Sequence, residues 1–356
     1  MTRTTLSLAC LLACLLAAAC AAPEVKETKT APAPVAEAKK EATPEPVVKL
    51  VSLDPAFDKL IAPGTKIDKL GDGYKWTEGP VWNKKDKYLL FSDIPNNQIV
   101  KWDGKALSQY LHPAGYTAKD AFTGKEPGTN GLSYDAQGRL TACAHGDRQV
   151  VRIEDDGKKR TPLAEKFEGK RFNSPNDLAW RKNGDLYFTD PPYGLPKGVD
   201  DPAREMDYCG VYRLDTKGKL TLLTKEITRP NGIAFSPDEK KLYVASSDPD
   251  KAIWMSYDVK PDGTLANGKV FFDSTAWAKE KRPGLPDGMK VDQTGNVWAT
   301  GPGGVHVFTP AGKHIGTIDT GVPTANVAFG EDGAILYITA NTALLRVKTA
   351  AKGTGF

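Results

Sequence analysis

The 356-residue chain contains few histidines and cysteines, and their spacing excludes the usual zinc sites. It has four His and five Cys. Cys10, Cys14 and Cys20 lie near the N-terminus, which leaves Cys143 and Cys209 for the rest of the chain. No Cys-x-x-Cys or Cys/His zinc pattern occurs, and the two remaining cysteines could form one disulfide without their spacing requiring it.

Basic clusters, amphipathic helices and hydrolase nucleophile motifs are also scarce. The formal net charge is +4, and no block of Lys and Arg marks a nucleic-acid face, so we expect no nucleic-acid partner. Beyond residue 51 helical periodicity is nearly absent, which argues against α/β folds with helices between strands. No G-x-S-x-G motif or Ser-His-Asp arrangement is evident. Nothing indicates an obligate protein partner.

The N-terminus has the pattern of an export signal. Arg3 precedes an apolar run over residues 6–19, which is too short to span a bilayer comfortably, and Cys20 follows small residues. The pattern resembles a bacterial lipoprotein signal, in which Cys20 becomes the lipidated first residue of the mature chain. We therefore expect a signal segment over residues 1–20 and a lipid-anchored protein in the cell envelope, in the periplasm or at the outer membrane. An ordinary secretory signal and a secreted protein are the alternative.

The composition changes twice along the chain. Residues 21–50 are rich in Ala, Pro, Glu and Lys, bury little apolar surface and are predicted to form a disordered tether. Residues 51–356 have the mixed composition of a folded domain. An anchor followed by a spacer would hold this domain away from a membrane.

The folded domain contains six copies of one pattern. Each copy has a short polar residue, an alternating apolar run, a turn and a second strand-like run, as in LPDGMKVDQTGNVWATG from Leu285. Successive copies are separated by 52, 46, 55, 56 and 39 residues. The polar residues of the six copies are Glu78, Asn130, Asn176, Asn231, Asp287 and Asn326.

Further strand-like sequence follows the hairpins. Four short strands per copy, repeated six times, predict an all-β fold, a six-bladed β-propeller. The last copy is too short for four strands, so residues 51–70 are expected to supply the missing strand and close the ring. The first strand of each blade lines the central channel, and the six polar residues should therefore surround one mouth of it.

Such a ring would offer an all-oxygen donor set with two carboxylates, Glu78 and Asp287. Ca²⁺ takes about 6–8 oxygen ligands, so it is the expected cation, with Mg²⁺, Mn²⁺ or Zn²⁺ as alternatives. Zinc prefers His and Cys, which the ring lacks. Any one of these motifs alone is more typical of a turn, and only the six together favour a metal site.

Other polar residues are expected near the same mouth, with a structural alternative for each. His145 is a rim residue or, less simply, a proton shuttle. Arg171 and Asn173 either project into the pocket or face solvent, and Asp190 either orients a ligand or caps a turn. The predicted substrate contacts are Asn130, His145, Arg171, Asn173, Asn176, Asp190 and Asn326.

Several motifs together resemble the gluconolactonase branch of the senescence-marker-protein (regucalcin-like) family. They are TEGPVW, NSPNDLAW, RPNGIAFSPDEKKLYVASSDP, GLPDGMKVDQTGNVWATG and NVAFG, within about residues 70–347. The resemblance implies a six-bladed propeller with one catalytic divalent ion, often Ca²⁺, at the channel mouth. The residues that it places there are Glu78, Asn231 and Asp287 as metal ligands, Asn176 as a metal or substrate ligand, and Arg171 at or near a substrate contact.

The implied reaction is hydrolysis of a gluconolactone-like sugar lactone to the aldonic acid. The cation would polarise the carbonyl and stabilise the developing oxyanion while water attacks. Asp287 is the candidate general base, and a metal-bound water is the competing one. Two other functions stay open: hydrolysis of phosphotriesters or other esters at the same metal site, and a non-catalytic binding propeller displayed on the envelope.

Overall fold

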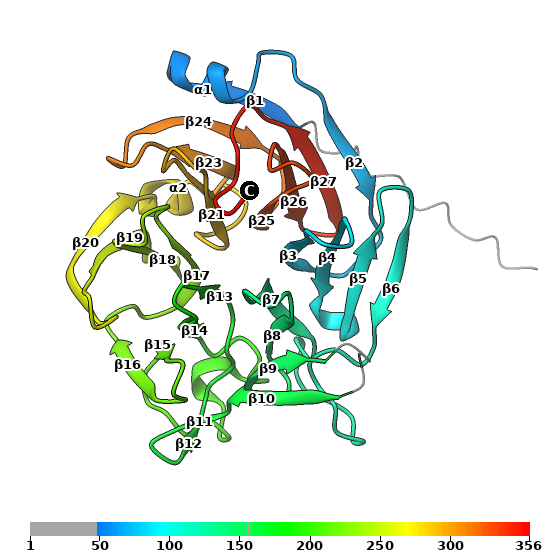
Figure 1. Ribbon diagram of the computed structural model, residues 1–356, viewed down its shortest axis with the longest axis vertical. Coiled ribbons are helices and arrows are strands. Elements are labelled where there is room, and N and C mark those ends of the chain that lie inside the picture. Colours follow the sequence, from blue (N-terminus) through cyan, green and yellow to red (C-terminus); the bar gives the residue numbers. More distant parts are fainter. Residues whose placement is uncertain (1–47, 155–156, 158) are drawn as a thin grey trace, which may run out of the picture. The chain divides into compact units, whose positions relative to one another are not determined.

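The repeated hairpins form six antiparallel sheets around a central axis (Figure 1), and the predicted six-bladed β-propeller is confirmed. This computed structural model describes residues 48–154, 157 and 159–356. The predicted signal segment with Cys20, and the predicted tether up to residue 47, lie outside the described residues. Within the described residues, no helix is long and apolar enough to cross a bilayer.

The first four blades are each built from consecutive strands, with the first strand innermost. Blade one comprises β3 (Thr77–Asn83), β4 (Tyr88–Asp93), β5 (Gln98–Trp102) and β6 (Leu107–Leu111). Blade two comprises β7 (Thr129–Tyr134), β8 (Leu140–Ala144), β9 (Gln149–Ile153) and β10 (Arg160–Ala164). Blade three comprises β13 (Leu178–Trp180), β14 (Leu186–Asp190), β15 (Gly210–Leu214) and β16 (Leu220–Thr224). Blade four comprises β17 (Pro230–Phe235), β18 (Lys241–Asp248), β19 (Lys251–Val259) and β20 (Leu265–Asp273).

The last two blades borrow their outermost strands from the beginning of the domain. Blade five comprises β21 (Met289–Val291), β22 (Val297–Gly301), β23 (Gly304–Phe308) and β24 (His314–Asp319), with β1 (Lys49–Ser52) as a fifth strand. Blade six comprises β25 (Thr324–Gly330), β26 (Ile335–Ala340) and β27 (Ala343–Lys348), and β2 (Ile67–Gly71) completes it. The predicted closing strand within residues 51–70 is thus confirmed, because β2 pairs antiparallel with β27.

Short elements fill the connections between these strands. They are α1 (Pro55–Leu60), α2 (Thr275–Lys279), the 3-10 turns η1 (Ile94–Asn96) and η2 (Gly198–Asp200), and the small hairpin β11 (Lys166–Phe167) with β12 (Lys170–Arg171). Helix α1 begins where the side chain of Asp54 accepts the N–H of Ala56 at 2.8 Å.

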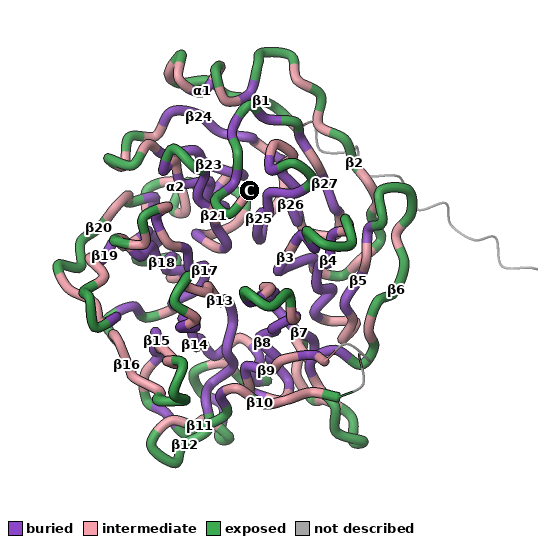
Figure 2. The backbone as a smooth tube through the Cα atoms, in the orientation of Figure 1, coloured by how far each residue is buried: buried purple, intermediate pink, exposed green. Residues whose placement is uncertain are grey.

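Apolar side chains are buried between blades rather than in one central core. Each of six buried clusters joins the facing sheets of two neighbouring blades. Phe57 and Ile61, from α1 and the residue after it, extend the cluster between blades five and six. Inner strands are buried and outer strands are more exposed (Figure 2). Because the hydrophobic core lies between neighbouring blades, the residues around the central axis need not be apolar. The only two cysteines of the described residues, Cys143 and Cys209, are buried and unpaired.

The hairpin spacing positions the polar residues at one end of the channel. In five blades the second strand begins ten residues after the polar residue, and in the sixth it begins nine residues after. The pairing of Thr77 with Asp93 and of Glu78 with Ser92 shows that the second strand returns to the end where the first began.

Candidate functional site at the hub of the propeller

The six polar residues of the repeats lie where the inner strands begin, and most of them are nearly inaccessible to solvent. Glu78, Asn130, Asn176, Asn231 and Asn326 are each at most 5% exposed. Asp287 remains partly exposed. The inner strands of neighbouring blades contact one another around the whole ring, so these residues from distant parts of the chain are brought to one hub.

A glycine follows the polar residue in four of the copies because neighbouring strands approach too closely for a side chain. A Cβ on Gly232 would lie 2.1 Å from the carbonyl oxygen of Asp287, and one on Gly288 would lie 1.9 Å from Cγ of Asn326. Among these four glycines, which are Gly79, Gly131, Gly232 and Gly288, positive φ occurs at Gly79 alone. Close approach of the neighbouring inner strand, through its backbone or a hub side chain, is therefore the main reason for the recurrent glycine, rather than a turn.

The amide side chains of the hub form a continuous chain of hydrogen bonds. Nδ2 of Asn130 donates to Oδ1 of Asn176 at 2.9 Å, and Nδ2 of Asn176 donates to Oδ1 of Asn231 at 2.6 Å. Nδ2 of Asn231 donates to the hydroxyl of Ser247 at 2.9 Å, and that hydroxyl donates to the carbonyl of Pro286. Three consecutive blades are thus linked at the axis by side chains that the sequence repeat singled out.

The two carboxyl groups of the repeat, Glu78 and Asp287, lie close enough for the charge of Glu78 to raise the pKa of Asp287. Burial raises the pKa of Glu78 to about 8, although the N–H of Gly79 donates to it at 2.8 Å. Burial also raises the pKa of Asp287 well above its ordinary value, and the negative charge of Glu78 raises it further. Oδ1 of Asp287 is buried and has no hydrogen-bond partner. Two like charges in a buried site favour retention of a proton, or the presence of a cation.

A third buried carboxylate, Asp177, lies at the hub and was missed by the sequence analysis. Burial raises its pKa, whereas the ammonium of Lys290 lowers it. The signal was its position: Asp177 follows Asn176 where four other copies have glycine. Nζ of Lys290 also lies 3.5 Å from Oδ1 of Asn326. The ammonium group of Lys290 therefore lies near two hub residues, Asp177 and Asn326.

Glu126 is a second residue that the repeat pattern did not reveal. It lies in the long connection between blades one and two, and its side chain is 31% exposed. Its Oε2 is 3.0 Å from Nδ1 of His145, but without the alignment of a hydrogen bond. The other ring nitrogen of His145 lies 3.2 Å from Oδ1 of Asn176. His145, itself fully buried, therefore connects the open side of the mouth to the amide chain.

Three of the predicted substrate contacts have other partners. The guanidinium of Arg171 donates to the carbonyl of Asp147 at 3.0 Å, and Arg171 is exposed. Asn173 is fully buried, and its amide donates to the carbonyls of Asp190 and Tyr208. The carboxylate of Asp190 accepts the N–H groups of residues 173 and 174, each at 2.8 Å. These hydrogen bonds hold the segment that leads into Asn176, and they do not bring the three side chains into the amide chain of the hub.

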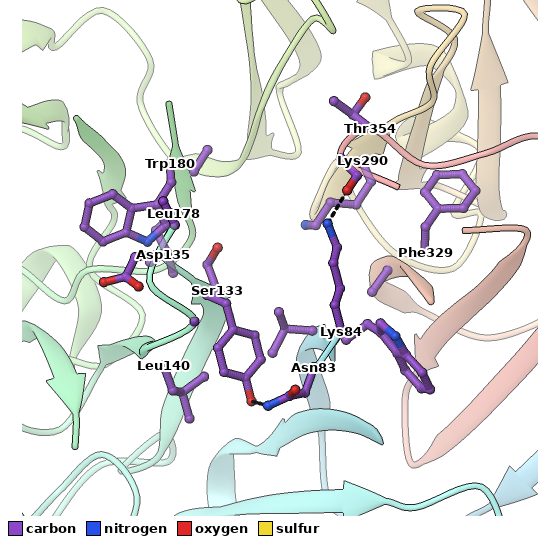
Figure 3. A pocket seen from close by; sticks show the side chains of 18 of the residues that line it. Asn83, Lys84, Ser133, Asp135, Leu140, Leu178, Trp180, Lys290, Phe329 and Thr354 are labelled. Carbon is purple, nitrogen blue, oxygen red and sulfur yellow. Dashed lines mark hydrogen bonds between the residues drawn. The ribbon is translucent and has the colours of Figure 1, made fainter. Parts of the chain in front are cut away.

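A cavity of about 960 Å³ opens at the other end of the channel. It is lined by residues of the inner strands, including Ser133, Leu178 and Lys290, and by Thr354 near the C-terminus (Figure 3). The carboxyl pair and the three linked asparagines are not among its lining residues. Lys290 lines this cavity and also lies beside Asn326, so it stands between the cavity and the hub. The carboxyl pair itself belongs to the hub.

The residues of the hub suit a hard divalent cation. Their donors are carboxylate and amide oxygens, which Ca²⁺ and Mg²⁺ prefer. Two crowded carboxyl groups and the unpartnered Oδ1 of Asp287 mark a place where positive charge is missing. Among the described residues, no group of three or more His, Cys, Asp or Glu side chains is arranged to hold a metal. A cation at the hub would therefore depend on amide oxygens as well as on the two carboxylates.

Comparisons with known proteins agree with this architecture. The family profile described as the SMP-30/Gluconolactonase/LRE-like region matches residues 76–342. A gluconolactonase from Zymomonas mobilis is 39% identical over 317 residues, which cover 86% of this chain and 87% of that protein. A pentonolactonase from Haloferax volcanii is 27% identical over 271 residues, which cover 74% and 80%. The solved structure of a gluconolactonase from Xanthomonas campestris is similar with a TM-score of 0.74 at 30% identity, and covers 86% of this chain and 96% of that one.

Proposed function

Because the chain belongs to the SMP-30/Gluconolactonase/LRE-like family, we propose that it hydrolyses a sugar lactone of the gluconolactone type to the open aldonic acid. The observation that carries the proposal is the meeting of Glu78 and Asp287, from blades one and five, beside a chain of buried amides. Such a site offers acceptors for a proton and ligands for a cation without a covalent nucleophile.

The proposed cofactor is a divalent cation, Ca²⁺ in the first place, with Mg²⁺, Mn²⁺ or Zn²⁺ as alternatives. Glu78, Asn231 and Asp287 would hold it, together with Asn176. When bound, such a cation polarises a carbonyl oxygen and stabilises the negative charge that develops on it. The crowded carboxyl pair and the free Oδ1 of Asp287 support this assignment.

Asp287, in its ionised form, is the candidate to accept a proton during the reaction. Its Oδ1 has no hydrogen-bond partner, and the residue keeps a partly exposed surface. The attacking water forms a bond to the carbonyl carbon and gives its proton to Asp287. The bond between that carbon and the ring oxygen then breaks, and Asp287 returns its proton to the ring oxygen, which becomes a hydroxyl group of the open-chain aldonic acid. Asn130, His145 and Asn326 belong to the same hub and would orient the lactone.

Arg171 has a weaker claim to a substrate role. Its guanidinium is bound to the carbonyl of Asp147, so it would first have to leave that partner. Arg171→Ala should therefore change KM by less than Asn130→Ala, which removes a buried hub amide. A large rise in KM for Arg171→Ala, with KM of Asn130→Ala unchanged, would reverse the assignment.

A substrate panel tests the proposal. The full chain would be assayed with aldonolactones, simple lactones and phosphotriesters, each with Ca²⁺ and with a chelator. We expect aldonolactone hydrolysis that is lost with chelator and in Glu78→Gln and Asp287→Ala, and kept in the exposed control Glu226→Gln. Preference for phosphotriesters would favour the second hydrolase function. Tight lactone binding without turnover would favour a binding propeller.

We also propose that Cys20 carries a lipid and anchors the protein in the cell envelope, in the periplasm or at the outer membrane. The support is the sequence pattern of the first twenty residues. Cys20→Ser should abolish incorporation of labelled palmitate and release the protein from the membrane fraction. Membrane association that survives in Cys20→Ser would contradict the anchor.

A further inference from the structure

Hydrogen-bond partners fix the orientation of one hub amide, that of Asn231. The hydroxyl of Ser247 has one proton, which it gives to the carbonyl of Pro286 at 2.5 Å. That hydroxyl can therefore only accept from Asn231, 2.9 Å away, so the atom facing it must be Nδ2. The carbonyl oxygen of Asn231 consequently faces the hub, as a cation ligand should.

The amide of Asn176 has no such independent constraint. A half-turn of an amide exchanges its oxygen and nitrogen and leaves every distance between heavy atoms unchanged. One of the two positions faces Asn130 and His145, at 2.9 and 3.2 Å, and the other faces Oδ1 of Asn231 at 2.6 Å. On the other side, Oδ1 of Asn130 has no hydrogen-bond partner, so nothing there prevents the Asn130 amide from turning as well.

When the ring of His145 is neutral, its tautomer decides between the two orientations of Asn176. With the oxygen of Asn176 facing the ring, Nε2 of His145 must carry the proton, and Nδ1 must lack it in the neutral ring. Nδ1 would then face the carboxylate of Glu126 at 3.0 Å with no proton between two acceptors. If Nδ1 carries the proton instead, it can donate to Glu126, whose 31% exposed side chain has room to turn into alignment.

If Nδ1 of His145 carries the proton, Nε2 is a hydrogen-bond acceptor. The amide nitrogen of Asn176 must then face Nε2 and donate to it. The oxygen of Asn176 then faces the oxygen of Asn231 at the 2.6 Å separation of the two amides. Two oxygens at this distance repel each other unless a cation lies against both. The orientation that Glu126 favours is therefore the one that presents two amide oxygens to a cation.

We propose that Glu126 is a positioning residue, which acts through His145 to turn the carbonyl oxygen of Asn176 toward the cation site. In the other orientation Asn176 donates to Asn231, and the contact between Glu126 and His145 is unsatisfied. This inference rests on the proposed metal-dependent function. Partners of this kind, outside the ligands themselves, typically change metal affinity by about 10- to 100-fold.

Calcium titration of the full chain by calorimetry tests the role of Glu126. Glu126→Ala should weaken Ca²⁺ binding by about 10-fold or more. Asp120→Ala, which removes an exposed carboxylate from the same connection, should bind like the wild type. A double-mutant cycle separates positioning from simple attraction of the cation. In a His145→Gln background Glu126→Ala should have no further effect, whereas attraction alone would weaken binding equally in both backgrounds and overturn the inference.

The tautomer of His145 gives a readout that does not depend on affinity. The chain has four histidines, so selective ¹⁵N-histidine labelling gives few signals, and His145→Gln assigns the one of interest. Addition of saturating Ca²⁺ should leave Nδ1 protonated and Nε2 unprotonated. A proton retained on Nε2 under these conditions would overturn the inference while leaving the lactonase proposal intact. Lactone hydrolysis without any bound cation would overturn both.

Discussion

Replacement of Glu78 by glutamine should stabilise the cation-free protein at alkaline pH. The folded state holds a proton on Glu78 up to a pKa of about 8, whereas the ordinary value is 4.5. Between these two values the folded state binds more protons than the unfolded state, so stability falls as the pH rises. The stabilisation is complete below about pH 4.5 and is lost as the pH passes through about 8.

The magnitude follows from the difference in pKa. A shift from 4.5 to about 8 is 8 − 4.5 = 3.5 units, and at about 1.4 kcal/mol per unit this is on the order of 5 kcal/mol. Glutamine has the same shape and can still accept the N–H of Gly79, but it never ionises. Glu78→Gln should therefore lose most of this dependence, and the pKa of Asp287 should fall because a neighbouring charge is gone.

The effect on the free energy of unfolding can be measured by chemical denaturation in the presence of a chelator. Unfolding is followed by circular dichroism at pH values between about 4.5 and 8 and above. The exposed control Glu226→Gln should reproduce the wild-type pH dependence. Added Ca²⁺ should restore the stability of the wild type at alkaline pH and should have little effect on Glu78→Gln. A wild-type free energy of unfolding that is flat across the range, or an equal slope in Glu78→Gln, would refute this account of the hub.

Three further predictions concern packing and closure. Gly288→Ala should destabilise the protein by about 1–3 kcal/mol, because its Cβ would lie 1.9 Å from Cγ of Asn326; the double variant with Asn326→Ala should recover part of this in thermal unfolding, and no recovery would contradict the contact. Asp190→Ala should cost about 2–4 kcal/mol, because it leaves the buried N–H groups of residues 173 and 174 unpaired; a denaturation midpoint equal to that of the wild type would contradict this. A chain that lacks residues 1–71 should aggregate in size-exclusion chromatography, because the edges of β24 and β27 become unpaired, and a monomeric product of normal thermal stability would show that β1 and β2 are dispensable.

The six-bladed propeller was predictable from the sequence because each blade repeats the same hairpin. The polar residue and the start of the second strand keep almost the same separation in every copy, so Glu78 and Asp287 could be related across more than two hundred residues. The closing strand was predictable from the short last copy. The glycine that follows four of the polar residues is explained by the structure, which relates it to the close approach of the inner strands at the axis.

The surroundings of the hub were less predictable, because they do not follow the repeat. Glu126 comes from a connection between blades, and its proximity to His145 depends on how that loop folds over the mouth. Lys290 is one residue among many lysines until the ring places it beside Asp177. Asn173 and Asp190 looked like ligands because they are polar residues near the motif, but their hydrogen bonds satisfy the backbone and side chains of the loop itself.

The pairing of β2 with β27 also constrains the time course of folding. Ile67 pairs with Val347, a separation of 347 − 67 = 280 residues, and Lys49 pairs with Asp319, a separation of 319 − 49 = 270. Blades five and six therefore cannot be completed until nearly the whole polypeptide has been synthesised. Contacts of such long range form slowly. In the nascent chain, β1 and β2 therefore stay unpaired until β24 and β27 have been synthesised.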